Sequence, residues 1–106
     1  MIDAPAGSIA VIFLSQRTAA DEPGYAAASA EMEAIVKAMP GYLGMDSARA
    51  GDGVGITISY WRDEESVAGW REHARHTEIR EQAREHWYDW YRVIVARAER
   101  SYAWRR

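Results

Sequence analysis

The fold of this chain is decided by one apolar stretch near its start, Ile9-Ala10-Val11-Ile12-Phe13-Leu14. The stretch is short, rich in β-branched residues, and apolar at both odd and even positions. Such a pattern is typical of a β-strand that is covered on both faces. It is too short for a membrane span or the apolar region of a signal peptide. We therefore predict a buried strand here, in a protein with no membrane partner.

A helix and a β-hairpin are predicted next. Pro23 suits a first helical turn, and apolar side chains then recur with helical spacing at Tyr25, Ala28, Met32, Ile35, Val36 and Met39. The pair Pro40-Gly41 should end this helix. Two strands, 42–49 and 54–61, should follow, joined by the turn residues Gly51-Asp52-Gly53.

The second half of the chain predicts a helix and a last strand. Asp63 can cap a helix that runs from Glu64 to about Trp87, in one piece or two. The segment after it is rich in aromatic and β-branched residues, which favours a strand over 91–103. The order β-α-β-β-α(α)-β predicts a ferredoxin-like α+β fold, with an antiparallel sheet and helices on one face.

Composition limits the classes of protein. The chain has 106 residues, 48% hydrophobic and 27% charged, which suits one globular domain over 1–106 with its core at about 8–103. It has no cysteine, so thiol chemistry and disulfides are excluded, and a cytoplasmic protein is expected. The net charge is −3, and bases alternate with acids, as in Arg71-Glu72. This pattern argues against a nucleic-acid partner, which would require a basic surface.

The predicted topology leaves one face of the sheet uncovered. The first and last strands are apolar at both parities, yet the helices can cover only one face. Large exposed apolar patches are rare in monomers. We therefore expect a homodimer, in which a second copy covers the helix-free face and forms a sheet-on-sheet or barrel-like contact.

Several segments, in this order and spacing, resemble the antibiotic biosynthesis monooxygenase domain family. The resemblance spans about 9–102 and is carried by 9–13, Met39-Pro40-Gly41-Tyr42-Leu43, 60–67, Trp70-Arg71, Glu72-His73, His76, Gln82, 90–93 and 100–102. It is closest to a branch of small bacterial proteins that are mostly uncharacterised. The resemblance implies a dimeric α/β barrel. It also implies oxygenation of phenols without metal or flavin, in which the substrate carbanion itself reduces oxygen.

Neither known chemistry of this family is reproduced residue by residue. Trp61 matches a pocket aromatic of the cofactor-independent members, but Thr57 and Val67 stand where those members have Asn and Tyr. Trp70 matches a tryptophan of the heme-degrading members, but Arg80 stands at the position of their heme-ligating histidine. The chain has no asparagine at all. The match to the heme-degrading members is the weaker of the two, because a guanidinium cannot ligate iron.

Histidines and aromatics supply the candidate site. Trp70, His73 and His76 are spaced by three, so on one helix they lie close together, and a neutral imidazole can act as a general base. We predict His73 and His76 as catalytic residues, and as substrate-binding residues Trp61, Trp70, Phe13, Thr57 and Arg84. The alternative is a purely structural role, in which the tryptophans pack in the core and the histidines are half-exposed polar residues. A metal held by the two histidines and Glu72 lacks an evident further ligand, so no metal is predicted.

The resemblance, together with the clustered tryptophans and histidines, implies a cofactor-independent monooxygenase that acts with molecular oxygen on a flat aromatic or phenolic molecule, bound between sheet and helices. Two alternatives stay open. One is a heme-binding or heme-degrading protein of the same fold. The other is a non-catalytic dimer that binds a small molecule or is associated with stress.

Overall fold

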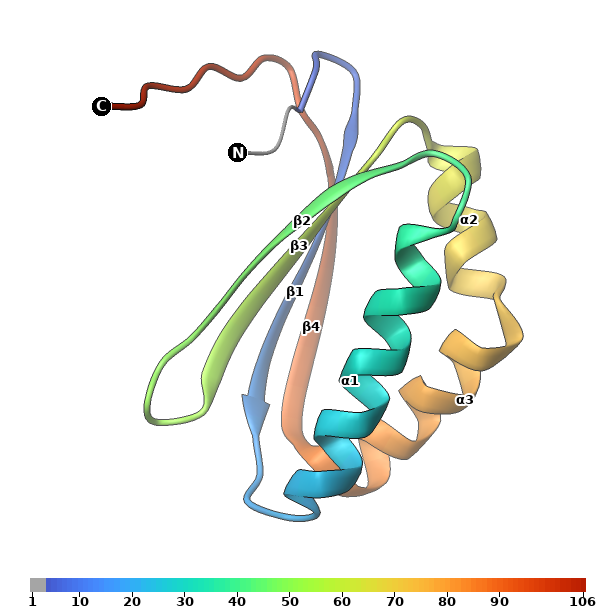
Figure 1. Ribbon diagram of the computed structural model, residues 1–106, viewed down its shortest axis with the longest axis vertical. Coiled ribbons are helices and arrows are strands. Elements are labelled where there is room, and N and C mark those ends of the chain that lie inside the picture. The colour runs from blue at the N-terminus through green and yellow to red at the C-terminus, as the bar shows by residue number, and fades with distance from the viewer. Residues whose placement is uncertain (1–3) are drawn as a thin grey trace.

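The computed structural model describes residues 4–106 and has the predicted ferredoxin-like α+β fold (Figure 1). Four antiparallel strands form one sheet in the order β2-β3-β1-β4. The helices pack on one face of this sheet. The elements are β1 (Ile9–Arg17), α1 (Glu22–Lys37), β2 (Tyr42–Arg49), β3 (Val54–Trp61), α2 (Glu64–Glu72), α3 (Ala74–Gln82), the π-helix η1 (Ala83–Trp87) and β4 (Tyr88–Arg97).

Side-chain caps and glycines set the element boundaries. Asp21, in a left-handed conformation, accepts a hydrogen bond from the Gly24 amide and caps α1. Asp63 accepts one from the Ser66 amide at 2.8 Å and caps α2, as predicted. Gly41 follows α1 with φ +81°, a conformation that glycine adopts without strain. These contacts confirm the predicted helix starts and the break after the first helix.

The last strand differs from its prediction at both ends. It spans Tyr88–Arg97 and not 91–103. It ends early because Arg97 pairs with Ile9, the first residue of β1. Ala98 still exchanges backbone hydrogen bonds with Gly7 and Ser8, but these residues lie outside the strands. It begins early because Tyr88 pairs with Arg17 across a β-bulge. Beyond Ala98 the chain leaves the sheet as an extended arm (Figure 1).

The helix predicted over 64–87 is divided. His73 has extended backbone angles, φ −59° and ψ 126°, and separates α2 from α3. Its side chain then caps α3, because Nδ1 accepts a hydrogen bond from the Arg75 amide. Beyond the break, α3 continues along the same side of the sheet toward the start of β4 (Figure 1).

Alternation along the strands separates two faces. The odd positions of β1 face the helices, with Ile9 and Val11 packed against the core. The even positions face away, together with Ile58 and Ile94 opposite Ile12. This second face carries apolar residues of three strands, and within residues 4–106 the helices pack on the other face (Figure 1). Every helix in the same range is too short or too polar to cross a bilayer.

Two groups of buried residues lie between helices and sheet. The first comprises Ile9, Val36, Trp61 and Trp70. The second comprises Ala28, Ile79, Ala83 and Trp87. Met32, on α1, touches both groups and joins them into a single layer under the helices.

Candidate functional site

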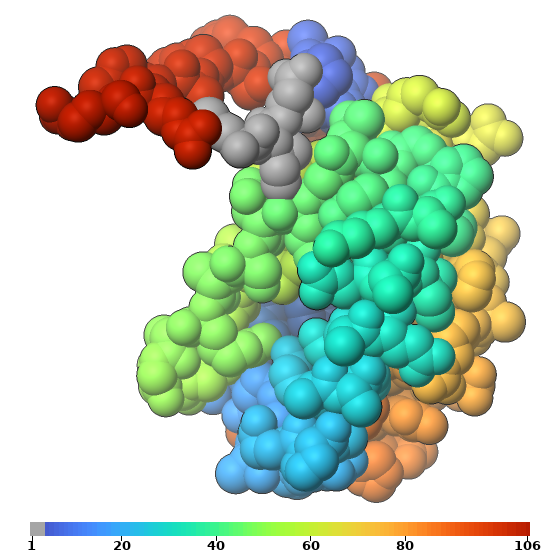
Figure 2. Space-filling model, viewed as in Figure 1, coloured from blue at the N-terminus to red at the C-terminus, as the bar shows by residue number. Residues whose placement is uncertain are grey.

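The surface is hollowed between the β2–β3 hairpin and α1 (Figure 2). In that view the hairpin is green, α1 is cyan, and β1 is seen in blue at the base of the hollow. Two rows of helix-facing residues cross this part of the sheet. One row is Ser47, Thr57 and Phe13, and the next is Arg49, Gly55 and Ser15. Most of these side chains are small. Ser15 and Gly55 are buried beneath Arg49, whereas Ser47 is exposed and Thr57 and Phe13 are half-buried.

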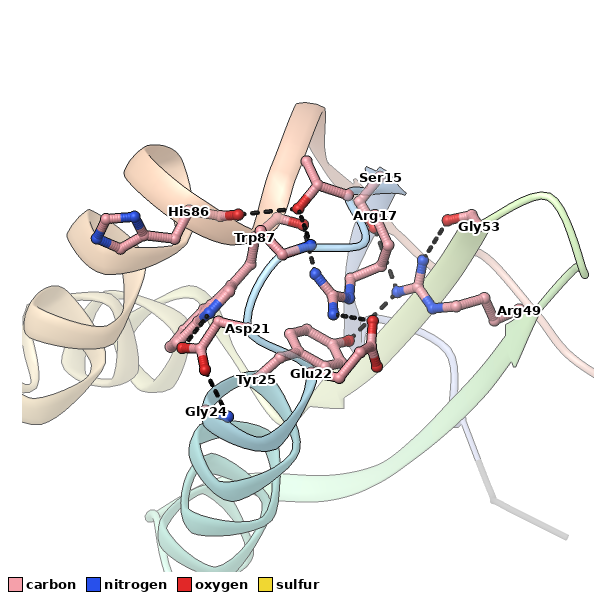
Figure 3. Close-up of polar contacts among 12 residues, drawn as sticks. Ser15, Arg17, Asp21, Glu22, Gly24, Tyr25, Arg49, Gly53, His86 and Trp87 are labelled. Carbon is pink, nitrogen blue, oxygen red and sulfur yellow. Dashed lines mark hydrogen bonds and ion pairs between the residues drawn. The ribbon is translucent and has the colours of Figure 1, made fainter.

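Arg49 extends from β2 across the sheet toward Ser15 and Tyr25 (Figure 3). Its Nη1 donates to the Gly53 carbonyl at 2.5 Å. Its Nη2 lies 3.4 Å from both the Ser15 Oγ and the Tyr25 Oη. Arg49 is paired with Gly55, and a Cβ at Gly55 would lie only 2.6 Å from the Arg49 Cζ. The absence of a side chain at Gly55 therefore makes the space in which this guanidinium lies.

A second arginine nearby has a different environment. The Arg17 side chain is buried, and its two terminal nitrogens donate to the Trp87 carbonyl and the Glu22 carboxylate, each at 2.6 Å. Its guanidinium also covers the Tyr25 ring at 3.7 Å (Figure 3 shows the hydrogen bonds). Arg17 is therefore neutralised and ties β1 to the start of α1 and the end of η1.

Aromatic rings form the wall of the site on the β4 side. Phe13 is 5.4 Å from Tyr88 and 5.3 Å from Tyr91, measured between ring centroids. Tyr25 meets Tyr88 edge-on at 6.0 Å. The β-bulge at Gln16/Arg17 accounts for the two β4 tyrosines meeting the same ring although they are three residues apart. Burial and a hydrogen bond with Tyr25 raise the pKa of Tyr88, so its phenol stays neutral around pH 7.

Three of the predicted site residues belong to this region. Phe13 and Thr57 are paired on adjacent strands, and the Thr57 Oγ1 lies 2.9 Å from the Ser47 Oγ. Arg84 is exposed, and its Nε donates to the Tyr91 hydroxyl at 2.6 Å. Arg84 therefore contacts the outer side of the ring on which Phe13 stacks.

The other four predicted residues lie together at the opposite end of the helix-covered layer. Trp61 is fully buried and stacks on Trp70, whose ring in turn stacks on His76 at 4.2 Å. The Trp61 Nε1 donates to Ser59 at 2.8 Å. His73 lies 6.1 Å from the Trp70 ring. The structure thus divides the predicted residues into two groups, and α1 lies between the hairpin and α2–α3 in Figure 1.

His76 is held as a neutral imidazole. Its Nδ1 lies 3.0 Å from the Trp70 carbonyl oxygen, an arrangement that suits a proton on Nδ1. Burial lowers the pKa of His76, and the positive charge of Arg80 acts in the same direction. His76 therefore has a lone pair available on Nε2 at neutral pH, which a proton acceptor needs.

Two further features bear on ligand binding. Among residues 4–106, no group of three or more His, Asp and Glu side chains could hold a metal ion. A separate surface cavity of about 320 Å³ lies where α1 ends and α2 begins, lined by Met39, Pro40, Arg62, Glu65, Ser66 and Gly69. It contains none of the predicted site residues.

Sequence reasoning missed the polar part of the hollow. The sequence pattern predicts Tyr25 only as a buried helix residue, and Arg49 only as the end of a strand. A signal is present, because the turn at Gly51-Asp52-Gly53 fixes the hairpin register and so pairs Arg49 with Gly55. A long basic side chain opposite a glycine has room to lie across the sheet.

The fold and the hollow define a small ferredoxin-like α+β protein with an aromatic-walled recess beneath its helices. The family model for antibiotic biosynthesis monooxygenase matches residues 8–82, and the chain belongs to this family. It is also 40% identical over 92 residues to the uncharacterised protein YqjZ of Bacillus subtilis (strain 168), covering 87% of this chain and 80% of that protein.

Solved structures share the fold at low sequence identity. A conserved protein from Methanosarcina mazei Go1 has a TM-score of 0.77 at 13% identity, covering 87% of this chain and 93% of that one. SnoaB from Streptomyces nogalater, described as a cofactor-independent oxygenase, has a TM-score of 0.76 at 13% identity, covering 91% and 97%. At such identities these likenesses establish the common architecture.

Proposed function

We propose that this protein is a cofactor-independent monooxygenase that binds a flat phenolic molecule in the hollow between α1 and the β2–β3 hairpin. The observation that carries the proposal is the hollow itself, with Phe13, Tyr25 and Tyr88 as aromatic walls, in a member of the antibiotic biosynthesis monooxygenase family. Aromatic walls favour planar ligands through edge-on and stacked contacts. The description of SnoaB as cofactor-independent supports the absence of a cofactor.

The proposed reaction consumes one oxygen molecule. The bound phenol or its keto tautomer loses a proton, and the resulting carbanion gives one electron to O₂. The radical and superoxide combine to form a C–O bond, and the peroxide formed loses water to leave a quinone. With anthrone, the products are anthraquinone and one water, so all atoms balance. The protein binds and orients the ring and favours the anion, and these contributions can be large.

The predicted proton acceptors are His76 and His73. His76 is the better candidate, because burial lowers its pKa and so favours the neutral imidazole that can accept a proton. We propose this role separately from the hollow, since the histidines lie at the other end of the layer, with Trp61 and Trp70. A proton acceptor must lie within hydrogen-bond reach of its substrate, so this role requires the reacting carbon to extend from the hollow to His76. If it does, His73→Ala and His76→Ala should abolish turnover. Unchanged rates in both variants would remove the histidines from the mechanism and leave the binding proposal standing.

Oxygen uptake with anthrone in air-saturated buffer tests the proposed function. We expect uptake above the protein-free rate, with anthraquinone as the product. Thr57→Leu should lower the rate by about tenfold or more, because it fills the hollow and displaces the ring. Thr77→Leu, on α3, is the matched control and should retain the rate. Equal rates for Thr57→Leu and the unmodified protein would contradict the proposal.

The heme alternative is not favoured by the site. Arg80 stands at the position of the expected iron ligand, and the matched Trp70 is packed between Trp61 and His76. The residues present therefore do not fit heme. The absence of a Soret shift on titration with hemin is the expected result.

We further propose that a second copy covers the helix-free face. Ile12, Ile58 and Ile94 lie in one row across this face, and Trp90 on the same strand as Ile94 is 48% exposed. A contiguous apolar surface of this kind is rarely left in water. Ile58→Asp should convert a dimer to a monomer in analytical ultracentrifugation, whereas Ala30→Asp, on the exposed side of α1, should not. If the unmodified protein is a monomer, the proposed dimer is contradicted.

A further inference from the structure

The guanidinium of Arg49 forms a cationic end to the aromatic hollow. We infer that Arg49 is an anion receptor, and that the preferred ligand is a flat aromatic molecule carrying an oxyanion, either a carboxylate or a phenolate. The inference rests on the proposed function in one respect, because it specifies the substrate class of the same hollow. Three features of Arg49 support it.

The first feature is that the guanidinium is held in a fixed position. A Cβ at Gly55 would lie 2.7 and 2.9 Å from the two terminal nitrogens of Arg49, distances that real Cβ atoms do not show. The glycine therefore lets the planar group lie against the strand. The Gly53 carbonyl accepts from Nη1 and fixes its orientation. A side chain held in this way loses little entropy when it binds an anion.

The second feature is that the charge is not neutralised. Within residues 4–106, no carboxylate lies within 4.0 Å of Arg49, whereas Arg17 is paired with Glu22 and Arg75 with Glu31. The partners of Arg49 are a carbonyl and two hydroxyls, and both hydroxyl contacts are long, at 3.4 Å. A guanidinium has five N–H donors arranged as a fork, so further donors remain for an oxyanion.

The third feature is the neighbourhood of the charge. The Tyr25 hydroxyl lies beside Nη2, and the Tyr25 ring meets Tyr88, which meets Phe13. Burial raises the pKa of Tyr88, so this wall brings no competing negative charge. An aromatic ring placed against the wall would present an oxygen substituent to Arg49. Bidentate contact with an oxyanion is the interaction for which a guanidinium is best suited.

Binding of a matched pair of probes tests the inference without turnover. Isothermal titration should show that 2-naphthoate binds at least about tenfold more tightly than its uncharged methyl ester, a ratio typical of one charge-assisted contact. Arg49→Gln should reduce 2-naphthoate binding to the level of the ester and leave ester binding unchanged. Arg71→Gln, an exposed arginine on α2, is the charge control. A second arm with 4-nitrophenol, above and below its ionisation, distinguishes phenolate from carboxylate recognition.

A positional variant separates geometry from charge. Gly55→Ala keeps the charge but pushes the guanidinium aside, so it should weaken naphthoate binding several-fold. Gly51→Ala, in the same hairpin, would meet no atom within 4 Å and should bind normally. Circular dichroism confirms that each variant is folded. Equal affinity for acid and ester in the unmodified protein, no binding of either, or an acid preference that survives Arg49→Gln would overturn the inference.

The outcomes also separate this inference from the proposed function. Arg49-dependent binding of the acid without oxygen uptake on any phenol would support the receptor and contradict the monooxygenase. Oxygen uptake that is the same in the unmodified protein and in Arg49→Gln, at subsaturating substrate, would support the monooxygenase and contradict the receptor.

Discussion

The two ends of the β1–β3 pair are built from the same two strands but have opposite properties. At one end Ile9 pairs with Trp61, and the space under the helices is filled by stacked rings. At the other end Ser15 pairs with Gly55, and both residues are buried beneath the side chain of Arg49, which lies beside the hollow. The difference in side-chain volume decides which end is core and which end is recess. We call them the closed end and the open end.

The largest expected effect is on stability at the closed end. Trp61 is fully buried and contacts both Tyr42 and Trp70. Trp61→Ala should lower the free energy of unfolding by about 3–5 kcal/mol, because it removes a large buried side chain and leaves a cavity. Urea denaturation measures this loss. A loss below about 1 kcal/mol would show that the closed end is not the core of the molecule.

A smaller effect is expected at Gly41, next to the closed end. Its φ is +81°, and a Cβ there would lie 2.0 Å from the Ser66 Oγ. Gly41→Ala should destabilise the protein by about 1–3 kcal/mol, from backbone strain and the displacement of Ser66. Gly51→Ala is the control, since a Cβ at that position meets nothing within 4 Å. Equal unfolding midpoints for the two variants would contradict the close approach of α2 to this turn.

The closed end is easier to predict from the sequence than the open end, because hydrophobic pattern and turn chemistry are local signals. Residues such as Ile9, Asp63 and Gly41 are enough to indicate the element order and the antiparallel sheet. Such signals do not predict two boundaries, the division of the helix at His73 and the end of β4 at Arg97. The first depends on a single ψ angle, and the second on where β1 begins.

Only part of the candidate site can be predicted from the sequence, again because only local patterns are visible there. Phe13 and Thr57 can be placed from strand alternation and family resemblance, and both lie at the hollow. Trp70, His73 and His76 are predicted to lie close together on one helix. They do lie close together, although the helix breaks at His73, but their spacing carries no information about whether they enclose space or fill it. Arg49 and Tyr25 meet through pairing across the sheet and packing of α1, which no local pattern reports.

The pH dependence of stability tests one contact of the closed end. Hydrogen bonds from the Ser66 hydroxyl and amide, and then from Arg62, lower the pKa of Asp63 to about 2. Since this value is below that of the unfolded chain, the stabilisation is present above about pH 4 and is lost as the pH falls toward 2.

Asp63→Asn should therefore flatten the decline of the unfolding midpoint between about pH 4 and pH 2. Asp89→Asn, at an exposed position of β4, is the control measured in parallel. A decline between these pH values that is as steep in Asp63→Asn as in the unmodified protein would contradict the role of this carboxylate.

The smallest effect on stability is expected at the open end. The Tyr25 hydroxyl has a long contact of 3.4 Å with the Arg49 Nη2 and shares a hydrogen bond with Tyr88. Tyr25→Phe should lower the free energy of unfolding by about 1 kcal/mol or less, because hydrogen bonds of this kind contribute little net stability. Thermal unfolding of the two proteins measures this difference in stability. A loss comparable to that of Trp61→Ala would mean that the open end is also structural core.

Ligand binding at the open end, and not at the closed end, is the property on which both proposals for the hollow depend. The most direct test is titration of ¹⁵N-labelled protein with 2-naphthoate, followed by amide chemical shifts. We expect the largest changes in 13–15, 45–49 and 55–57, which contribute the two rows across the hollow. Changes confined to 70–76, the segment of Trp70, His73 and His76, with the hairpin unaffected, would contradict binding at the open end.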